Sequence, residues 1–153
     1  MQQDLKNSAG KDQVLNEEKE YLLTDYSELS FIKEIEKHYD LKIRTKEFAH
    51  RCVKLAVSLP GNQLGNHIRG QMIRASTSVA ANYRASQVAH SKKGFVAKLS
   101  IVIEECDECA FWIEFAGDEE LITISRISAL LEEARELTSI FITARKTAQT
   151  GEK

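Results

Sequence analysis

Two cysteines, Cys106 and Cys109, have the type and spacing that most resemble a chemical site. A Cys-x-x-Cys pair supplies half of a tetrahedral zinc site or a thiol–disulfide redox pair. A zinc site needs two further ligands, and the one other cysteine, Cys52, stands alone. Both sulfurs also fall on the apolar positions of a helical pattern, where a free cysteine packs like a small hydrophobic side chain. The pattern therefore favours buried, reduced thiols in a cytoplasm over metal or redox chemistry.

The histidines give no stronger indication of catalysis. Glu47 and His50 have the Glu-x-x-His spacing of di-iron helical bundles, but such bundles carry that motif on two helices and this chain has one copy. His38, His67 and His90 form no arrangement that suggests catalysis, and neither a glycine-rich phosphate loop nor a nucleophile elbow occurs. We therefore expect a protein that is not an enzyme and that uses no metal or cofactor.

Positive charge is concentrated in one part of the sequence. Residues 42–98 hold eleven lysines and arginines and one acid, a formal charge of +10, whereas residues 99–136 carry −9. A basic face on the first two helices predicts binding to the phosphates of RNA or DNA, with an affinity that depends on salt. The candidate nucleic-acid-binding residues are Arg69, Arg74, Arg84, Lys92, Lys93 and Lys98. In the alternative, the cations pair with the acidic half of the same or an adjacent subunit, and the protein is a structural or protein-interaction scaffold.

Four helices are expected to position these residues. Apolar side chains recur at spacings of three and four over residues 40–59, 63–90 and 92–116, and from residue 120 or 124 to residue 147. Pro60 and Gly61 end the first helix sharply, and Gly117 with Asp118 ends the third. Short turns and the absence of strand-like alternation predict an all-α fold, an antiparallel up-down-up-down four-helix bundle.

The sequence divides into three parts around this bundle. Residues 1–39 are expected to form a helical or partly disordered N-terminal extension, residues 40–148 the bundle, and residues 149–153 a frayed tail. No apolar run approaches the length of about 20 residues that spans a bilayer, and the polar N-terminus lacks the apolar segment of a signal peptide. We therefore expect a cytoplasmic protein without a membrane partner.

The second helix contains an unusual run of small residues between its apolar positions, from Gln71 to Tyr83. Small side chains allow a neighbouring helix to approach closely. Arg74, Ser78 and Asn82 recur every four residues beside this run and form a polar stripe. We interpret the stripe as architectural rather than catalytic, with Arg74 forming a buried ion pair with Glu105 or Glu108 of the third helix.

Apolar residues also occur beyond the positions that one bundle core requires. A second apolar face, buried between subunits of a homo-oligomer, would account for them. The alternative is a wide core stripe with scattered exposed apolar residues, which are common. The residues concerned are Ile73, Val96, Ile103, Trp112, Phe115, Ile140 and Ile142.

Four segments resemble the 23S rRNA intervening-sequence protein family: residues 44–49 (RTKEFA), 71–85 (QMIRASTSVAANYRA), 91–100 (SKKGFVAKLS) and 105–114 (ECDECAFWIE). The resemblance covers about residues 40–148 and implies a bacterial four-helix bundle that assembles with itself into a ring, commonly a pentamer. A related branch, the accessory proteins of retroelements, binds nucleic acid and a reverse transcriptase, so the resemblance implies these as partners.

Two features depart from that branch. Tyr83-Arg84-Ala85 follows the asparagine of the motif, where other branches have an acidic Glu-Gly step, and the later helices are acidic rather than uniformly basic. Residues 1–39 match no part of the family pattern.

Overall fold

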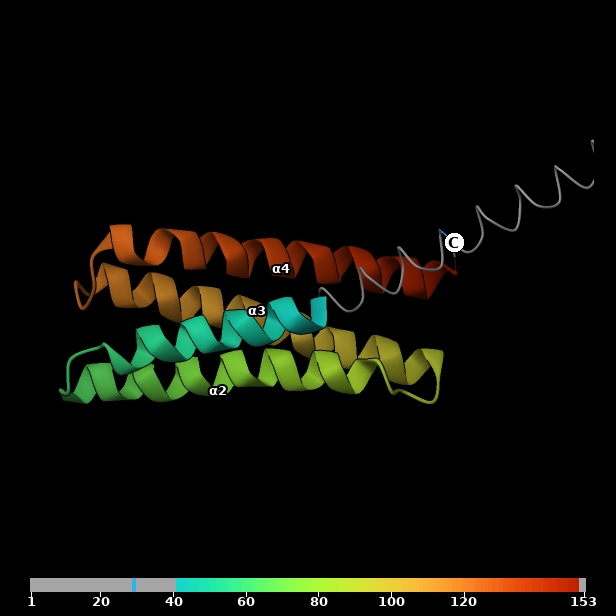
Figure 1. Cartoon of the computed structure of the whole chain (residues 1–153), viewed down its shortest axis with the longest axis horizontal. Coiled ribbons are helices and arrows are strands. Elements are labelled where there is room, and N and C mark those ends of the chain that lie inside the picture. The colour runs from blue at the N-terminus through green and yellow to red at the C-terminus, as the bar shows by residue number, and fades with distance from the viewer. Residues whose placement is uncertain (1–28, 30–40, 152–153) are drawn as a thin grey trace, which may run out of the picture. The chain divides into compact units, whose positions relative to one another are not determined.

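The computed structural model describes residue 29 and residues 41–151 of the chain. Residues 41–151 form four helices that run antiparallel in sequence order, with no strand among them (Figure 1). The first helix is described over residues 41–57, and it is followed by α2 (Gln63–Ser86), α3 (Lys92–Asp118) and α4 (Ile124–Thr150). The predicted all-α bundle is therefore confirmed. Apart from residue 29, the predicted N-terminal extension lies outside the described residues.

The turn between the first helix and α2 is built by its own sequence. Pro60 cannot continue a helix, and Asn62 then takes an extended conformation as the N-cap of α2. Its side-chain Oδ1 accepts a 2.7 Å hydrogen bond from the Gly65 amide. This cap satisfies one of the free amides of the first turn of α2.

The turn between α2 and α3 begins earlier than predicted. α2 ends at Ser86 rather than His90, and Ser86 Oγ donates a 2.7 Å hydrogen bond back to the carbonyl oxygen of Tyr83. Ser91 adopts an extended conformation and accepts a 3.0 Å hydrogen bond from the Gly94 amide as the N-cap of α3. Because Ser91 is extended, the chain must leave the helical conformation of α2 before that residue.

α3 ends at Asp118, within the Gly117–Asp118 pair that the sequence predicted to end it. Gly117 is the last but one residue of the helix and is buried, and a Cβ there would lie 2.6 Å from Cδ1 of Ile127. Gly117 therefore allows α4 to approach α3 closely. The helix ends at Asp118 with Glu119 as its C-cap, and the next residue, Glu120, has a left-handed φ of 55°. Leu121 N then donates to Ala116 O at 3.0 Å. Such a left-handed cap is usually made by glycine.

Replacing Glu120 with glycine should therefore stabilise the protein. Occupying the left-handed region costs a residue with a Cβ roughly 1 kcal/mol of conformational free energy, whereas glycine has no such cost. We expect Glu120→Gly to raise the free energy of unfolding by about 0.5–1 kcal/mol, as measured by urea denaturation. Glu119→Gly is the control, because Glu119 has an ordinary negative φ of −82° and loses only backbone rigidity. Equal or lower stability for Glu120→Gly would contradict the strain assigned to this cap.

One apolar core runs through the four helices. Leu41, Phe95 and Ala144 are partly buried against this core rather than within it. Its largest fully buried side chains come from every helix and include Phe48, Ile68, Met72, Leu99, Ile113, Ile127, Leu137 and Phe141. α4 continues to Thr150, into the segment predicted to fray, and ends at Gly151 with a left-handed φ of 73°. No helix in the described part of the chain is long and apolar enough to cross a membrane.

The seven extra apolar residues are all partly buried within the single chain. Four of them pack against the chain's own core: Ile73, Ile103, Trp112 and Phe115. A wide core stripe accounts for these four. The larger apolar side chains that stay exposed in residues 41–151 are different ones: Ile43, Val57, Val88, Phe111 and Ile124. The predicted subunit interface therefore stays a prediction, with other residues as its candidates.

Candidate nucleic-acid interface

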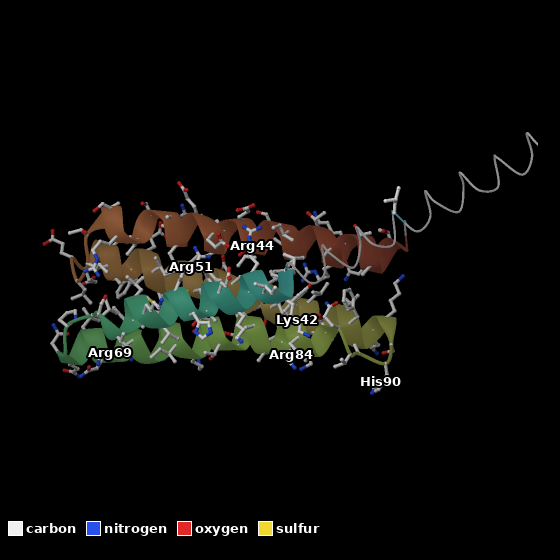
Figure 2. The ribbon with its side chains drawn as sticks, in the orientation of Figure 1. Lys42, Arg44, Arg51, Arg69, Arg84 and His90 are labelled. Carbon is white, nitrogen blue, oxygen red and sulfur yellow. The ribbon has the colours of Figure 1, made fainter. Side chains whose placement is uncertain are left out.

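The six predicted phosphate-binding residues occupy several parts of the bundle and have different surroundings. Figure 2 shows Arg69 near the start of α2, whereas Arg84 and His90 lie toward the opposite end of the bundle. Three of the six contact other groups of the chain: Arg69, Arg74 and Lys98. Lys92 makes a long contact of 3.4 Å with the carbonyl oxygen of Gln149. Arg84 and Lys93 are exposed and have no partner among the described residues.

Arg69 caps the end of the first helix. Its guanidinium donates to the backbone carbonyl oxygens of Ala56 and Leu59 at 3.2 and 2.7 Å, and to Asn66 Oδ1 at 2.8 Å. The last carbonyls of a helix have no partner within it, so a guanidinium there satisfies them. Arg69 is thus a structural link between the first helix and α2. The sequence did not indicate this role, because thirteen residues separate Arg69 from Ala56.

Replacing Arg69 with methionine should lower stability and leave nucleic-acid affinity nearly unchanged. The variant keeps the apolar stem of the side chain but loses its charged hydrogen bonds to two carbonyls. We expect a loss of about 2 kcal/mol in the free energy of unfolding by urea denaturation. Arg84→Met is the matched control in the same helix and should cost less than about 0.5 kcal/mol, since Arg84 is exposed. Equal stability losses in the two variants would contradict the capping role.

Arg74 joins α2 to α3. Its Nη2 pairs with Glu108, its Nη1 lies 3.3 Å from Glu105, and its Nε contacts Gln71 at 3.4 Å. The ion pair that the sequence predicted is thus formed with both carboxylates, but it is not buried, because the Arg74 side chain is 52% exposed. The guanidinium lowers the pKa of Glu108, burial acts in the opposite direction, and the indole N–H of Trp112 lowers it further.

Substitution of Arg74 should therefore have a pH-dependent effect on stability. A carboxylate whose pKa is lowered on folding contributes stability above its unfolded pKa, and loses that contribution as pH falls through the lowered value. We expect Arg74→Gln to be less stable than the wild type near pH 7. The difference should shrink as pH falls below about 4.3, the ordinary glutamate pKa. Thermal unfolding between pH 2.5 and 7 measures it, and a difference independent of pH would contradict the assignment.

The rest of the polar stripe of α2 also faces α3. Asn82 Nδ2 donates to the carbonyl oxygen and the hydroxyl of Ser78, each at 3.0 Å. Asn82 Oδ1 accepts from Lys98 Nζ of α3 at 3.2 Å. The predicted structural set of Arg74, Ser78, Asn82, Glu105 and Glu108 therefore lies along the contact between α2 and α3.

The three cysteines lie in the core and are free. The hydrogen bond between Cys52 and Cys109, together with burial, raises the pKa of the Cys109 thiol, and burial raises the pKa of Cys106. Thiols with raised pKa values stay protonated at neutral pH and are poor nucleophiles and metal ligands. The described residues contain no cluster of three or more side chains suited to hold a metal ion.

The first helix and α4 are joined by a second set of ion pairs. Arg44 contacts Glu133 at 2.8 Å and Glu136 at 2.7 Å, and Arg51 contacts Glu133 at 3.4 Å. The hydrogen bond to Glu133 raises the pKa of Arg44. Burial opposes the charged form of Glu133, but Arg44 and Arg51 outweigh it, so its pKa is lowered. Five of the eleven acids of residues 99–136 therefore form ion pairs within the described part of the chain: Glu105, Glu108, Glu114, Glu133 and Glu136.

The antiparallel fold separates the remaining charge along the length of the bundle. Residues 79–103 and 137–151 lie toward the end of the bundle that contains the α2–α3 turn, and residues 41–46, where the first helix begins, lie partway along the bundle (Figure 1). We call these three segments the basic end: they hold nine lysines and arginines and neither aspartate nor glutamate. The other residues of the described bundle, 47–78 and 104–136, hold twelve acids and six lysines and arginines, a formal charge of −6.

A shallow depression of about 380 Å³ lies at the α2–α3 turn, within the basic end. Its lining combines a lysine, an imidazole, hydroxyls, an amide and an aromatic ring: Ser86, Gln87, Ala89, His90, Ser91, Lys92 and Phe95. Arg145 and Lys146 add positive charge from the end of α4. The basic end can therefore attract polyanions, and the depression offers donors for a phosphate and a ring face for a base.

These features define the described part of the molecule as an antiparallel four-helix bundle in which residues 79–103 and 137–151 hold lysines and arginines and no aspartate or glutamate. Residues 37–143 match the sequence pattern of the 23S rRNA-intervening sequence protein family, so the chain belongs to that family. A crystal structure of a protein of unknown function from the S23 ribosomal protein family of Bacteroides thetaiotaomicron has a similar fold, with a TM-score of 0.65 and 31% sequence identity. The similarity covers 69% of this chain and 98% of that one. No functionally curated protein matches the chain.

Proposed function

We propose that this protein is a non-enzymatic, self-assembling bundle of the bacterial cytoplasm that binds RNA or DNA through its basic end. The observation that carries the proposal is the absence of carboxylates from residues 41–46, 79–103 and 137–151, which hold nine cations. Arg44 is paired with Glu133 and Glu136, but Arg84 and Lys93 are exposed and have no partner among the described residues. Such cations release counterions from a nucleic acid when they neutralise its phosphates. This site differs from the basic face of the first two helices that the sequence indicated, because Arg69 and Arg74 contact groups of the chain itself.

The nucleic acid should be bound mainly through its backbone. The tyrosine and phenylalanine side chains of the basic end are Tyr83, Phe95 and Phe141. Tyr83 and Phe141 are buried, so Phe95 at the depression is the ring available for stacking. Recognition by phosphate contacts predicts weak sequence preference. A reverse transcriptase is a further partner by analogy with the related retroelement branch. It would reach the basic end while it is itself bound to nucleic acid.

Equilibrium binding of labelled oligonucleotides tests this function. Fluorescence anisotropy would be measured with single-stranded RNA, single-stranded DNA and duplexes from 50 to 200 mM salt. Contacts to about four phosphates of a single strand predict that log affinity falls against log salt with a slope of about −3. Absence of binding to all of them at 50 mM salt would reject the proposal. The protein would then be an interaction scaffold. The contacts of Arg69, Arg74 and Lys98 with other groups of the chain favour this alternative.

A further inference from the structure

An acidic stripe with an aromatic centre lies on the outer face of α3. Its members recur at helical spacings of three and four and are all exposed: Glu104, Asp107, Phe111, Glu114 and Asp118. One of them, Glu114, pairs with Arg135 of α4 at 2.9 Å. Phe111 stands in the middle of the stripe with 51% of its surface exposed. A large ring left in water costs free energy that docking against another surface would recover.

The Phe111 ring is held in place by its neighbours. It packs edge-on against Trp112 with ring centroids 4.8 Å apart, and it stacks with Phe115 at 5.6 Å. Trp112 is itself fixed, because its Nε1 donates to Glu108 at 3.1 Å and His67 of α2 lies edge-on at 5.4 Å. An aromatic side chain that is already ordered loses little entropy on binding, which is typical of an interface hot spot.

A basic stripe of the same spacing lies on the outer face of the first helix. Its exposed members are Ile43, Lys46, His50, Lys54 and Val57. Apolar side chains stand at both ends, with 39% of Ile43 and 61% of Val57 exposed, and cationic or titratable groups stand between them. Among residues 41–57 of the first helix, Glu47 is the one carboxylate beside this stripe. Each stripe extends over fifteen residues, about 21 Å of helix.

These two stripes cannot meet within one chain. The buried faces of the first helix and α3 meet in the shared core, where Cys52 contacts Cys109. Their outer faces therefore point away from each other. The opposite charge and equal length of the two stripes match a contact between two copies.

We propose that the acidic α3 stripe of one copy docks on the basic first-helix stripe of a second copy, with Phe111 at the centre of the interface. This inference rests on the self-assembly included in the proposed function and assigns its surfaces. The two surfaces differ, so the contact is heterologous and every copy keeps one free stripe of each kind. Repetition of such a contact closes into a ring when the rotation between copies allows it.

Charge reversal with rescue tests this interface. Lys54→Glu and Asp107→Lys would each be measured by sedimentation velocity at about 10 μM protein, together with the double variant that swaps the two charges. Glu132→Lys and Lys146→Glu are matched controls, because both residues are exposed on α4 outside the two stripes. Far-UV circular dichroism checks that each variant is folded.

We expect an oligomeric wild type, at least tenfold weaker association in each single variant, and recovery in the double variant. Both controls should assemble like the wild type. A wild-type monomer would overturn this inference together with self-assembly. An oligomer that withstands both single reversals would overturn the assigned surfaces alone. Nucleic-acid binding is measured separately through Arg84 and Lys93, so its failure would leave the result for this interface unaffected.

Discussion

Replacing Gly65 with alanine is expected to destabilise the bundle by about 3 kcal/mol. A Cβ at this position would lie 2.1 Å from the carbonyl oxygen of Pro60, which is a backbone atom and cannot rotate away. The turn would have to shift as a whole. Such a shift disturbs the Asn62 cap, whose side chain accepts a hydrogen bond from the Gly65 amide. It also moves the carbonyl oxygen of Leu59, which accepts a hydrogen bond from Arg69. One methyl group thus acts on three linked contacts.

Gly70→Ala in the same helix is the matched control. A Cβ at Gly70 meets nothing within 4 Å, and the residue is exposed in the interior of α2. Alanine there should stabilise the protein by about 0.5–1 kcal/mol, because glycine loses more backbone entropy on forming a helix. Urea denaturation followed by circular dichroism measures both variants. A loss at Gly65 smaller than about 0.5 kcal/mol would show that the turn does not need this close approach.

Reversing two charges of the basic end is expected to abolish most nucleic-acid binding. Arg84 and Lys93 are exposed, lie on either side of the α2–α3 turn, and have no partner among the described residues. Their replacement by glutamate removes two phosphate contacts and adds repulsion. Each lost contact to a single strand reduces the salt slope by about 0.7. We expect Arg84→Glu with Lys93→Glu to lower the slope by at least about 1.4 and the affinity at 0.1 M salt by roughly 30-fold or more.

Arg126→Glu with Arg135→Glu is the control for net charge. It changes the charge of the molecule by the same amount, but both arginines lie on α4 at the acidic end. If binding depended only on overall charge, the two double variants would lose affinity equally. We expect less than about a threefold loss in the control, because exposed charges farther away than a Debye length of about 8 Å are largely screened. Equal losses would contradict a localised site.

Much of the architecture could be predicted from the sequence because local signals agreed with the tertiary structure. Apolar spacing located the four helices, and Pro60 with Asn62 marked the first turn at the right position. Gly117 with Asp118 marked the end of α3, but the sequence did not show that the small size of Gly117 also serves the packing of α4. The left-handed φ of Glu120, just after the C-cap of α3, could not be recognised, because an acidic residue gives no sequence signal for it.

The candidate site was harder to predict because it depends on which cations the fold leaves free. The ion pairing of Arg74 with Glu105 or Glu108 followed from matching stripes on two expected helices. The capping role of Arg69 did not, since the sequence does not show how closely α2 approaches the end of the first helix. The basic end also combines three separate segments, and the contribution of Arg145 and Lys146 becomes visible only once α4 returns to the α2–α3 turn.

Photo-crosslinking tests the central proposal most directly, because it reports both whether a nucleic acid binds and where it lies. A single-stranded RNA carrying 4-thiouridine would be irradiated with the wild-type protein at 50 mM salt, and crosslinked peptides would be identified by mass spectrometry. We predict crosslinks within residues 79–103 and 137–151, which disappear in the Arg84→Glu, Lys93→Glu variant. Crosslinks confined to residues 104–136, or none at a protein concentration of 10 μM, would contradict the assignment of nucleic-acid binding to the basic end.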